Sequence, residues 1–555
     1  MAPVLILPDL IVLGRVLTMD PAHPVAQAVA VTGGRISAVG DKSTLLAMAG
    51  PQTEVVDYAG ATILPGFVES HLHLVIGGAQ LAHLQLGGLA TLAGAKAAFG
   101  AFAAANPTAP LLMAQGGVYS LDGQPITRTM LDSIIPDRPI AITAIDLHTV
   151  WANTAALTAA GLLHGAKMPP GHEVVIGPDG TATGELREFE AFAPIIALGG
   201  EGRLNLGIST GRDPYPWPTA AEQAIDRAKA AVGLAHCARH GITSIINMDG
   251  NRYTLDLLAG LRAAGQLTAR VKVPFHFKPD MDLSDLDIAS ALWTDFNDDW
   301  LSSGFVKFFM DGVTDSRTAY QLHDYPGQPG HRSEPLFAPD RFARIATEVD
   351  RRGLQIAVHA IGDGAVQLTI NGLAAARKTN GPRDSRHRIE HIELIDPADI
   401  PRLAALGITA SVQPVHAPGA MDFALQPTLD IIGAARWPDA YLAKTLADQG
   451  ARIAFASDWP VTDVNVLRGI KAALTRAPYP GGTHQSLGLM ATLHAYTAGG
   501  AWAAHQEHLT GTLRPGLAAD IVVLSADIEA TPAAMIDQLH ITRTICAGQT
   551  TYRAD

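Results

Sequence analysis

Apolar runs alternate with amphipathic stretches through the middle of the chain. The runs are rich in Val, Ile and Phe, whereas the segments between most of them, such as residues 220–240 and 339–353, repeat Ala and Leu with helical spacing. Fully apolar strands that alternate with helices predict a parallel sheet covered on both faces. Eight runs match the strand number of a TIM-type barrel, and they occupy residues 63–73, 242–250, 270–277, 304–312, 354–363, 387–394, 408–416 and 452–461. A doubly wound open sheet is the alternative, although no glycine-rich phosphate loop follows the first run.

The two ends of the chain have short strand-like segments separated by turns, such as AQAVAVTGGRISAVG near the start and ADIVVLSADI near the end. We therefore predict an α/β fold in which residues 1–62 and 511–555 form a composite β-sandwich. Residues 63–79 and 219–510 then form a TIM-type (β/α)8 barrel. Residues 80–218 are far longer than an ordinary crossover, so they are predicted to be an inserted subdomain after the first barrel strand and a candidate lid.

Composition excludes several classes of protein. Apolar residues make up 48% of the 555 residues and charged residues 17%, which is enough apolar material for large buried cores. The net charge of −13 comes without a Lys/Arg-rich run, so no nucleic-acid partner is expected. Two cysteines fit a reducing cytoplasm. The apolar start of the chain resembles strand material, and no uninterrupted apolar stretch predicts a membrane span.

Histidines and an aspartate stand at the ends of several predicted strands. His71 and His73 are two residues apart, so in a strand they point to the same face. His359, His391 and Asp458 each lie near the end of a later run. In a barrel these ends converge on one mouth, where imidazoles and a carboxylate suit zinc or a similar divalent ion.

Lys307 is unusual because it lies inside an apolar run, GFVKFFMDG. A lysine there is costly unless its charge is paired or removed. It can form an ion pair with a carboxylate such as Asp311 or extend its amine beyond the strand end. Alternatively, carbon dioxide converts the amine into a carbamate, an anionic oxygen donor able to bridge two ions. The sequence leaves these alternatives open.

Together these residues resemble the amidohydrolase superfamily, in particular its YtcJ-like, amidohydrolase-3 branch, which includes N-substituted formamide deformylases. The similarity extends over nearly the whole chain. Its markers are PGFVESHLH (65–73), DLHTVWANTAAL (146–157), DGTATGELREFE (179–190), VKFFMDGVTDSRTA (306–319), VHAIGDGAV (358–366), RHRIEHIEL (386–394), SVQPVH (411–416), ASDWPV (456–461) and GTLRPGLAADIVVL (511–524).

The resemblance implies a β/α barrel with a β-sandwich built from both ends. It implies that His71, His73 and Asp458 hold one ion, and that His359 and His391 hold a second. Lys307, if carbamylated, would bridge them, and whether one ion or two is bound stays open. By the same likeness Asp458 is both a ligand and the catalytic proton shuttle.

Further residues are candidates for contacting substrate. His416 follows an apolar run at the expected mouth, while His148 depends on the resemblance. Arg317 is a candidate for binding an anionic group, or for pairing with a nearby aspartate. Trp151 and Trp459 are candidates for an apolar wall or for the core. The remaining histidines, including His83, His164, His236, His240 and His505, are interpreted as surface or structural residues.

The sequence therefore predicts a metal-dependent hydrolase that cleaves a C–N bond in an amide, formamide or cyclic amide of small molecular size. A metal-dependent isomerase, decarboxylase or ester hydrolase is the alternative within enzymes, because one fold hosts many reactions. A non-catalytic binding protein is the alternative outside them, and the complete ligand set argues against it. Substrate identity and oligomeric state are left open, with a homodimer as one candidate.

Overall fold

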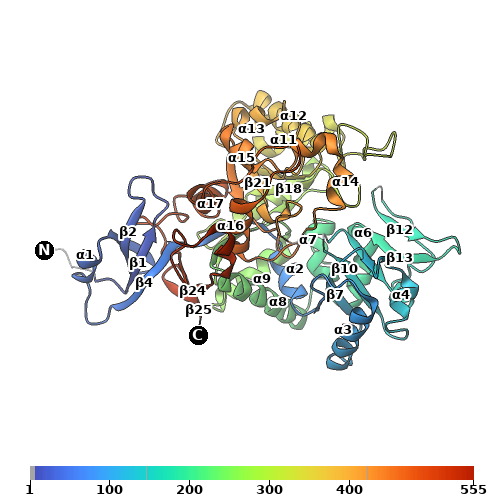
Figure 1. Cartoon of the computed structure of the whole chain (residues 1–555), viewed down its shortest axis with the longest axis horizontal. Helices are drawn as coiled ribbons and strands as arrows, with labels where there is room; N and C mark the ends of the chain where they lie inside the picture. The colour runs from blue at the N-terminus through green and yellow to red at the C-terminus, as the bar shows by residue number, and fades with distance from the viewer. Residues whose placement is uncertain (1–6, 146, 170, 422, 555) are drawn as a thin grey trace. The chain divides into compact units, whose positions relative to one another are not determined.

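A computed structural model describes residues 7–145, 147–169, 171–421 and 423–554 of the chain (Figure 1). The chain divides into two compact units. The first unit comprises Met1–His73, Leu234–Met248 and Leu258–Asp555, and the second comprises Leu74–Gly233 and Asp249–Leu257. No helix within the described ranges is both long and apolar enough to cross a membrane.

Parallel strands form the centre of the first unit, and each of the eight apolar runs contains one. Val, Ile and Phe side chains on both faces of these strands are buried, as expected for a parallel sheet covered on both sides. A six-stranded sheet has the order β16 (Phe275–His276), β18 (Phe305–Phe309), β19 (Gln355–Ala360), β20 (Arg388–His391), β21 (Thr409–Val412) and β22 (Arg452–Phe455). A four-stranded sheet has the order β17 (Leu301–Ser302), β15 (Arg270–Lys272), β14 (Ile242–Asn247) and β5 (Phe67–Leu72).

These strands follow one another in the order of a barrel, but they do not form the single closed ladder that the sequence predicted. The third run is divided, because β15 ends at Lys272 and β16 begins at Phe275. Pro274 lies between them and has no N–H to donate, which explains why the ladder changes sheet there. Beyond the strand ends, the Asp458 N–H donates to the His71 carbonyl at 2.9 Å, which joins the last run to the first.

Helices separate the strands along the chain and supply the second layer of the fold. In Figure 1, α11, α12, α13 and α15 lie around β18 and β21. Helix α11 places Phe342, Ile345, Ala346 and Val349 on its buried side, with the spacing of an amphipathic helix. The helices after β14 are α9 (Arg252–Ala263), α10 (Leu286–Asp295), α11 (Pro339–Arg351), α12 (Asp363–Asn380), α13 (Ile400–Leu406), α14 (Thr428–Ile432), α15 (Ala443–Asp448), α16 (Val466–Thr475), α17 (Leu489–Ala495) and α18 (Ala498–Ala503).

Strands from both ends of the chain share one seven-stranded sheet in the first unit. Alternate residues of its strand Leu10–Leu17 enter two apolar clusters, Leu10 and Val12 in one and Ile11 and Leu13 in the other. Both faces of this sheet are therefore covered. Its order is β25 (Gln549–Arg553), β24 (Ile541–Cys546), β23 (Ile521–Leu524), β4 (Glu54–Pro65), β1 (Leu10–Leu17), β2 (Val25–Thr32) and β3 (Arg35–Gly40), with α1 (Lys42–Leu46) after β3.

The second unit has its own six-stranded sheet and two apolar clusters. The order is β12 (Glu173–Ile176), β13 (Ala182–Arg187), β11 (Thr149–Ala152), β10 (Ile140–Ala144), β7 (Leu112–Gly117) and β6 (Leu84–Gln85), beside a small ribbon of β8 (Ser120–Leu121) and β9 (Gln124–Pro125). The helices that begin in it are α2 (Leu74–Gln80), α3 (Leu92–Ala105), α4 (Arg128–Asp132), α5 (Thr154–Ala159), α6 (Phe189–Leu198), α7 (Leu206–Ser209) and α8 (Ala220–Arg239).

Candidate metal centre

Four histidines and one aspartate lie at strand ends of the first unit. His71 lies in β5 and His73 follows that strand, while His359 is next to last in β19 and His391 ends β20. Asp458 follows β22. Each of the five residues is buried, with an exposed fraction of 7% or less. Parallel strands end at one edge, so the fold brings these side chains together.

Three of the imidazoles share the Asp458 carboxylate. His71 Nε2 and His73 Nε2 each lie 3.2 Å from Asp458 Oδ1, and His391 Nδ1 lies 3.9 Å from Oδ2. Ligand atoms of His71, His391 and Asp458 lie within 4.8 Å of one another. These three residues are therefore candidates for holding one ion.

His359 also lies beside His391, with 4.6 Å between their ring centroids. Its Nε2 atom lies 3.0 Å from the Gly312 carbonyl oxygen and 3.8 Å from Asp311 Oδ1. Asp311 also accepts hydrogen bonds from backbone N–H groups, including that of Ile361 at 3.1 Å. The segment after β18 is thereby held against the end of β19.

Lys307 lies in the middle of β18 and is fully buried. Its Nζ lies 5.2 Å from the ring centroid of Phe309, over the ring face. In the parallel ladder Lys307 is the register partner of His276, the last residue of β16. His276 is also fully buried, and its ring stacks on Phe309 at 5.3 Å. His276 was not predicted from the sequence, although it stands at a strand end as the other histidines do.

Two side chains from neighbouring strands orient the imidazoles. Glu390 Oε2 lies 2.7 Å from His71 Nδ1, and Gln413 Oε1 lies 2.9 Å from His391 Nδ1. A carboxylate oxygen only accepts, so the Nδ1–H of His71 donates to Glu390 and its Nε2 faces Asp458. Metal-binding histidines commonly have such outer partners. Neither Glu390 nor Gln413 was predicted from the sequence, because neither residue stands close to its partner in the chain.

Electrostatic interactions keep the charges of this centre fixed. Burial raises the pKa of Glu390, but Arg388 and His71 lower it by more than burial raises it. Arg388 donates to Glu390 Oε1 at 2.6 Å, and the pKa of Glu390 lies well below the ordinary range. Burial likewise opposes ionisation of Asp458, whose pKa the surrounding histidines, His71 first, hold well below the usual value. Burial, and then His359, lower the pKa of His391 far below its usual value. At neutral pH the centre therefore has two carboxylates and a neutral His391.

The backbone is strained where two of these side chains emerge. His391 has a φ of 74° and Asp458 a φ of 60°, both in the left-handed region that favours glycine. Such residues cost about 1–3 kcal/mol each and persist where the surrounding structure holds them. The bends turn both side chains toward the same edge of the sheet.

Glu69, two residues before His71, is a further residue that the sequence analysis missed. It is fully buried and accepts the N–H of Ser457 at 2.9 Å. Burial raises the pKa of this carboxyl to about 8. Glu69 therefore links β5 to the residue before Asp458. Its place inside the marker PGFVESHLH was the only available signal.

Two of the substrate-binding candidates belong to the first unit. The His416 ring is parallel to that of His391, with centroids 6.0 Å apart, and is buried. Arg317 lies in the segment after β18 with a φ of 57°. Their contact with substrate stays a prediction, and His416 is the one beside the centre.

The other two candidates, His148 and Trp151, belong to the second unit. His148 Nδ1 lies 2.8 Å from Glu188 Oε2. Trp151 in β11 is 1% exposed and packs in an apolar core, with its ring 5.1 Å from that of Tyr119. A role in binding substrate stays a prediction for both.

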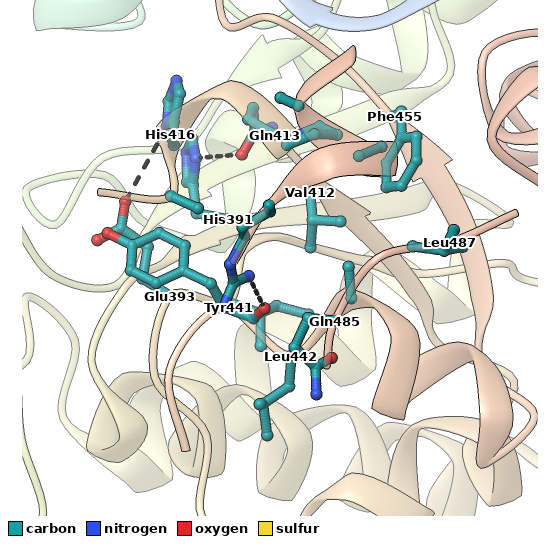
Figure 2. Close-up of a pocket in the computed structure, with 17 residues that line it drawn as sticks. His391, Glu393, Val412, Gln413, His416, Tyr441, Leu442, Phe455, Gln485 and Leu487 are labelled. Atoms are coloured by element: carbon teal, nitrogen blue, oxygen red, sulfur yellow. Dashed lines mark hydrogen bonds and ion pairs between the residues drawn. The ribbon is translucent and has the colours of Figure 1, made fainter. Parts of the chain in front are cut away.

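A small cavity of about 30 Å³ lies behind His391 (Figure 2). This volume is enough for about one or two water molecules. Figure 2 shows His416 and Glu393 on one side of His391, with Gln413 bonded to its ring. Burial raises the pKa of Glu393 to about 8.

The donor set fits a divalent transition ion. Imidazole nitrogens and one carboxylate are the ligands that zinc prefers. Neither ring nitrogen of the fully buried His276 has a hydrogen-bond partner among the described residues. Buried polar atoms normally have partners, so this observation is consistent with a site built to enclose another group.

Comparison with known proteins agrees with this geometry. The Amidohydrolase family model matches residues 54–552. Protein LONG AFTER FAR-RED 3 of Arabidopsis thaliana is 30% identical, over 95% of this chain and 88% of that protein. Putative amidohydrolase YtcJ of Bacillus subtilis is 28% identical, over 97% and 98%. N-substituted formamide deformylase of Arthrobacter pascens is 25% identical, over 98% of both chains.

A crystal structure of an uncharacterized metal-dependent hydrolase from Pyrococcus horikoshii OT3 shares the fold. It superposes with a TM-score of 0.71 at 22% identity, over 94% of this chain and 99% of that chain. The fold is thus a mixed α/β fold of the TIM-barrel type, and the family match supports a metal-dependent hydrolase. The chain belongs to the amidohydrolase family, in the YtcJ-like branch that the sequence predicted.

Proposed function

We propose that this protein hydrolyses a C–N bond in an amide, formamide or cyclic amide of small molecular size. The observation that carries the proposal is the convergence of three buried imidazoles on Asp458, with an ionised outer carboxylate bonded to His71. The name of the Arthrobacter pascens relative, a formamide deformylase, supports the bond type.

We propose zinc as the metal. His71, His73 and Asp458 would hold one ion, and His359 with His391 a second, if two are bound. Lys307 in carbamylated form would bridge the two, and its complete burial favours loss of the amine charge. A divalent ion supplies Lewis acidity, which makes water nucleophilic at neutral pH and polarises a carbonyl group.

The reaction then depends on proton transfer by Asp458. Its carboxylate accepts a proton as the water oxygen adds to the carbonyl carbon. The same carboxyl returns the proton to the nitrogen as the C–N bond breaks, which yields a carboxylic acid and an amine. The low pKa of Asp458 keeps it ionised and ready to accept the first proton at neutral pH.

Other residues would position the substrate. His416 beside His391 is the candidate donor to the developing oxyanion. Arg317 is the candidate for an anionic group, and His148 and Trp151 would contribute from the inserted region at 80–218. The composite β-sandwich at 1–62 and 511–555, the β/α barrel domain at 63–79 and 219–510, a cytoplasmic location and a homodimer also stay predictions.

The test couples metal analysis to a substrate screen. Elemental analysis of purified protein should find at least one equivalent of zinc per chain. A screen of N-formyl, N-acyl and cyclic amides, read as amine release, should find activity that Asp458→Asn abolishes. Metal-loaded protein that releases amine from none of these compounds would overturn the C–N assignment. Full turnover by Asp458→Asn would overturn the proton-transfer role.

A further inference from the structure

A second group of metal-binding side chains lies in the first unit, outside the centre described above. His236 is in the last turn of α8, His240 follows one turn later, and Asp463 lies in the loop after β22. One ligand atom from each lies within 4.8 Å of the others. The two imidazole rings are 4.9 Å apart and nearly perpendicular.

We propose that His236, His240 and Asp463 form a second metal site, which binds a zinc-like transition ion. Residues four apart on a helix lie on one face, so both imidazoles reach the same point in space. Two imidazoles and one carboxylate favour zinc and similar ions, whereas magnesium and calcium prefer oxygen ligands. Zinc–nitrogen bonds of about 2.0–2.1 Å require the ligand atoms to approach somewhat more closely than they do here.

The protonation state of the histidines favours metal binding. Burial lowers the pKa of His236, and burial with His236 as neighbour lowers that of His240 to about 4. Arg239 lowers both further, whereas Asp463 raises both. At neutral pH the two rings are therefore uncharged and offer lone pairs, as metal ligands must.

Asp463 has the capacity for an additional ligand bond. Its Oδ1 accepts the Asn465 N–H and its Oδ2 accepts from Arg468 Nη1, each at 3.1 Å. The Arg468 contact is partly exposed and therefore weak. A carboxylate has about four lone-pair sites, so these two bonds leave room for an ion.

This site is connected to the catalytic loop. The His236 ring lies 5.3 Å from that of Trp459, the residue after Asp458. The Trp459 carbonyl accepts the N–H of His73 at 2.8 Å. An ion held by His236 and Asp463 would therefore join helix α8 to the loop that carries Asp458. The site is thus suited to stabilise this loop while leaving the ligands of the centre in place.

Zinc titration of the purified holoenzyme tests the proposal. Wild-type protein should bind one equivalent more than His240→Gln or Asp463→Asn at micromolar free zinc, read by elemental analysis after desalting. Zinc should also raise the melting temperature of wild type more than that of either variant. His164→Gln, at an exposed histidine, and Asp448→Asn, at an exposed aspartate, are matched controls and should bind as wild type does. Equal zinc content in wild type and both site variants would overturn the proposal.

A measurement on wild type alone covers the case in which a variant misfolds. Diethyl pyrocarbonate modifies accessible neutral imidazoles, and peptide mass spectrometry locates the product. Zinc should protect His236 and His240 from modification several-fold while the exposed His164 reacts equally with and without the ion. Unchanged modification of His236 and His240 in saturating zinc would contradict the second site. Neither result depends on the catalysed reaction.

Discussion

The metal centre and the buried ionic cluster of the second unit each surround one carboxylate, but with different side chains. In the second unit Arg203 donates to both oxygens of the fully buried Asp226, at 2.6 and 2.8 Å. The Tyr253 hydroxyl adds a third bond at 2.5 Å. Every donor there meets an acceptor, so the cluster is complete within the protein.

In the metal centre the side chains around the carboxylate are imidazoles. His71, His73 and His391 share the single carboxylate of Asp458. Glu390 and Gln413 hydrogen-bond to two of the rings and hold them in place. The comparison teaches that a surplus of oriented imidazoles over carboxylates, more than burial or charge alone, distinguishes a site for a cation from a structural ion-pair cluster.

The largest expected effect comes from Asp458→Asn. Removing the shared carboxylate and proton acceptor should lower kcat by about 10⁴-fold, the upper end of the contribution of general acid–base catalysis. The fold should survive, because asparagine has nearly the same shape. Steady-state kinetics and circular dichroism measure the two quantities. Asp448→Asn, at an exposed i,i+4 pair, is the control and should behave as wild type.

The next effect is expected in the second unit. Arg203→Met leaves the buried Asp226 charge without its guanidinium, which should lower the free energy of unfolding by about 3–5 kcal/mol. Metal content should stay at the wild-type value. Denaturant titration and elemental analysis check both, with the exposed Arg351→Met as control. If Arg203→Met lost metal as well as stability, the Arg203–Asp226 cluster would not be a structural cluster separate from the metal centre.

Acid should weaken the second unit through Glu201. Burial opposes ionisation of Glu201, but His83 at 3.1 Å and Lys229 at 2.7 Å lower its pKa from 4.5 to about 2. A depressed carboxyl pKa contributes stability that is complete above pH 4.5 and is lost as the pH falls toward 2. The contribution is up to about 3 kcal/mol at neutral pH. The stability difference between wild type and Glu201→Gln should therefore shrink on acidification, and a constant difference would contradict the prediction.

The smallest effect is expected from the outer partner of His71. Glu390→Gln removes the anion that fixes the ring and should weaken metal affinity by about 10–100-fold. Competition with a chelator of known affinity measures this change. Glu529→Gln, at a half-exposed ion pair with Arg15, is the control. An unchanged metal affinity of Glu390→Gln would show that the imidazoles bind metal without a carboxylate partner to orient the His71 ring.

Much of the fold could be predicted from periodicity. Each of the eight apolar runs contains a strand, since Val- and Ile-rich segments between helical repeats have few other solutions. The division of the barrel at Pro274 was not predicted, although a proline inside a strand run is a known interruption of the ladder. Strand β4 also extends to Pro65, so the composite sheet reaches into the first run.

The candidate site was only partly predictable. His71, His359 and His391 stand where strands end, so their proximity follows from topology. The partnership of His71 with Glu390 crosses 319 positions of the chain and depends on side-chain geometry that periodicity does not contain. His236 and His240 were interpreted as surface or structural residues because Asp463, which lies beside them, is distant in sequence.

The backbone at His391 and Asp458 has the left-handed conformation that glycine adopts readily, so either residue can be replaced by glycine without backbone strain. Glycine adopts that conformation without penalty, so His391→Gly relieves the local strain while it deletes the ring. The vacated space would have the shape of an imidazole, beside Gln413. Free imidazole supplied from solution can then take the place of the side chain, which makes this centre suited to chemical complementation with ligands of chosen basicity.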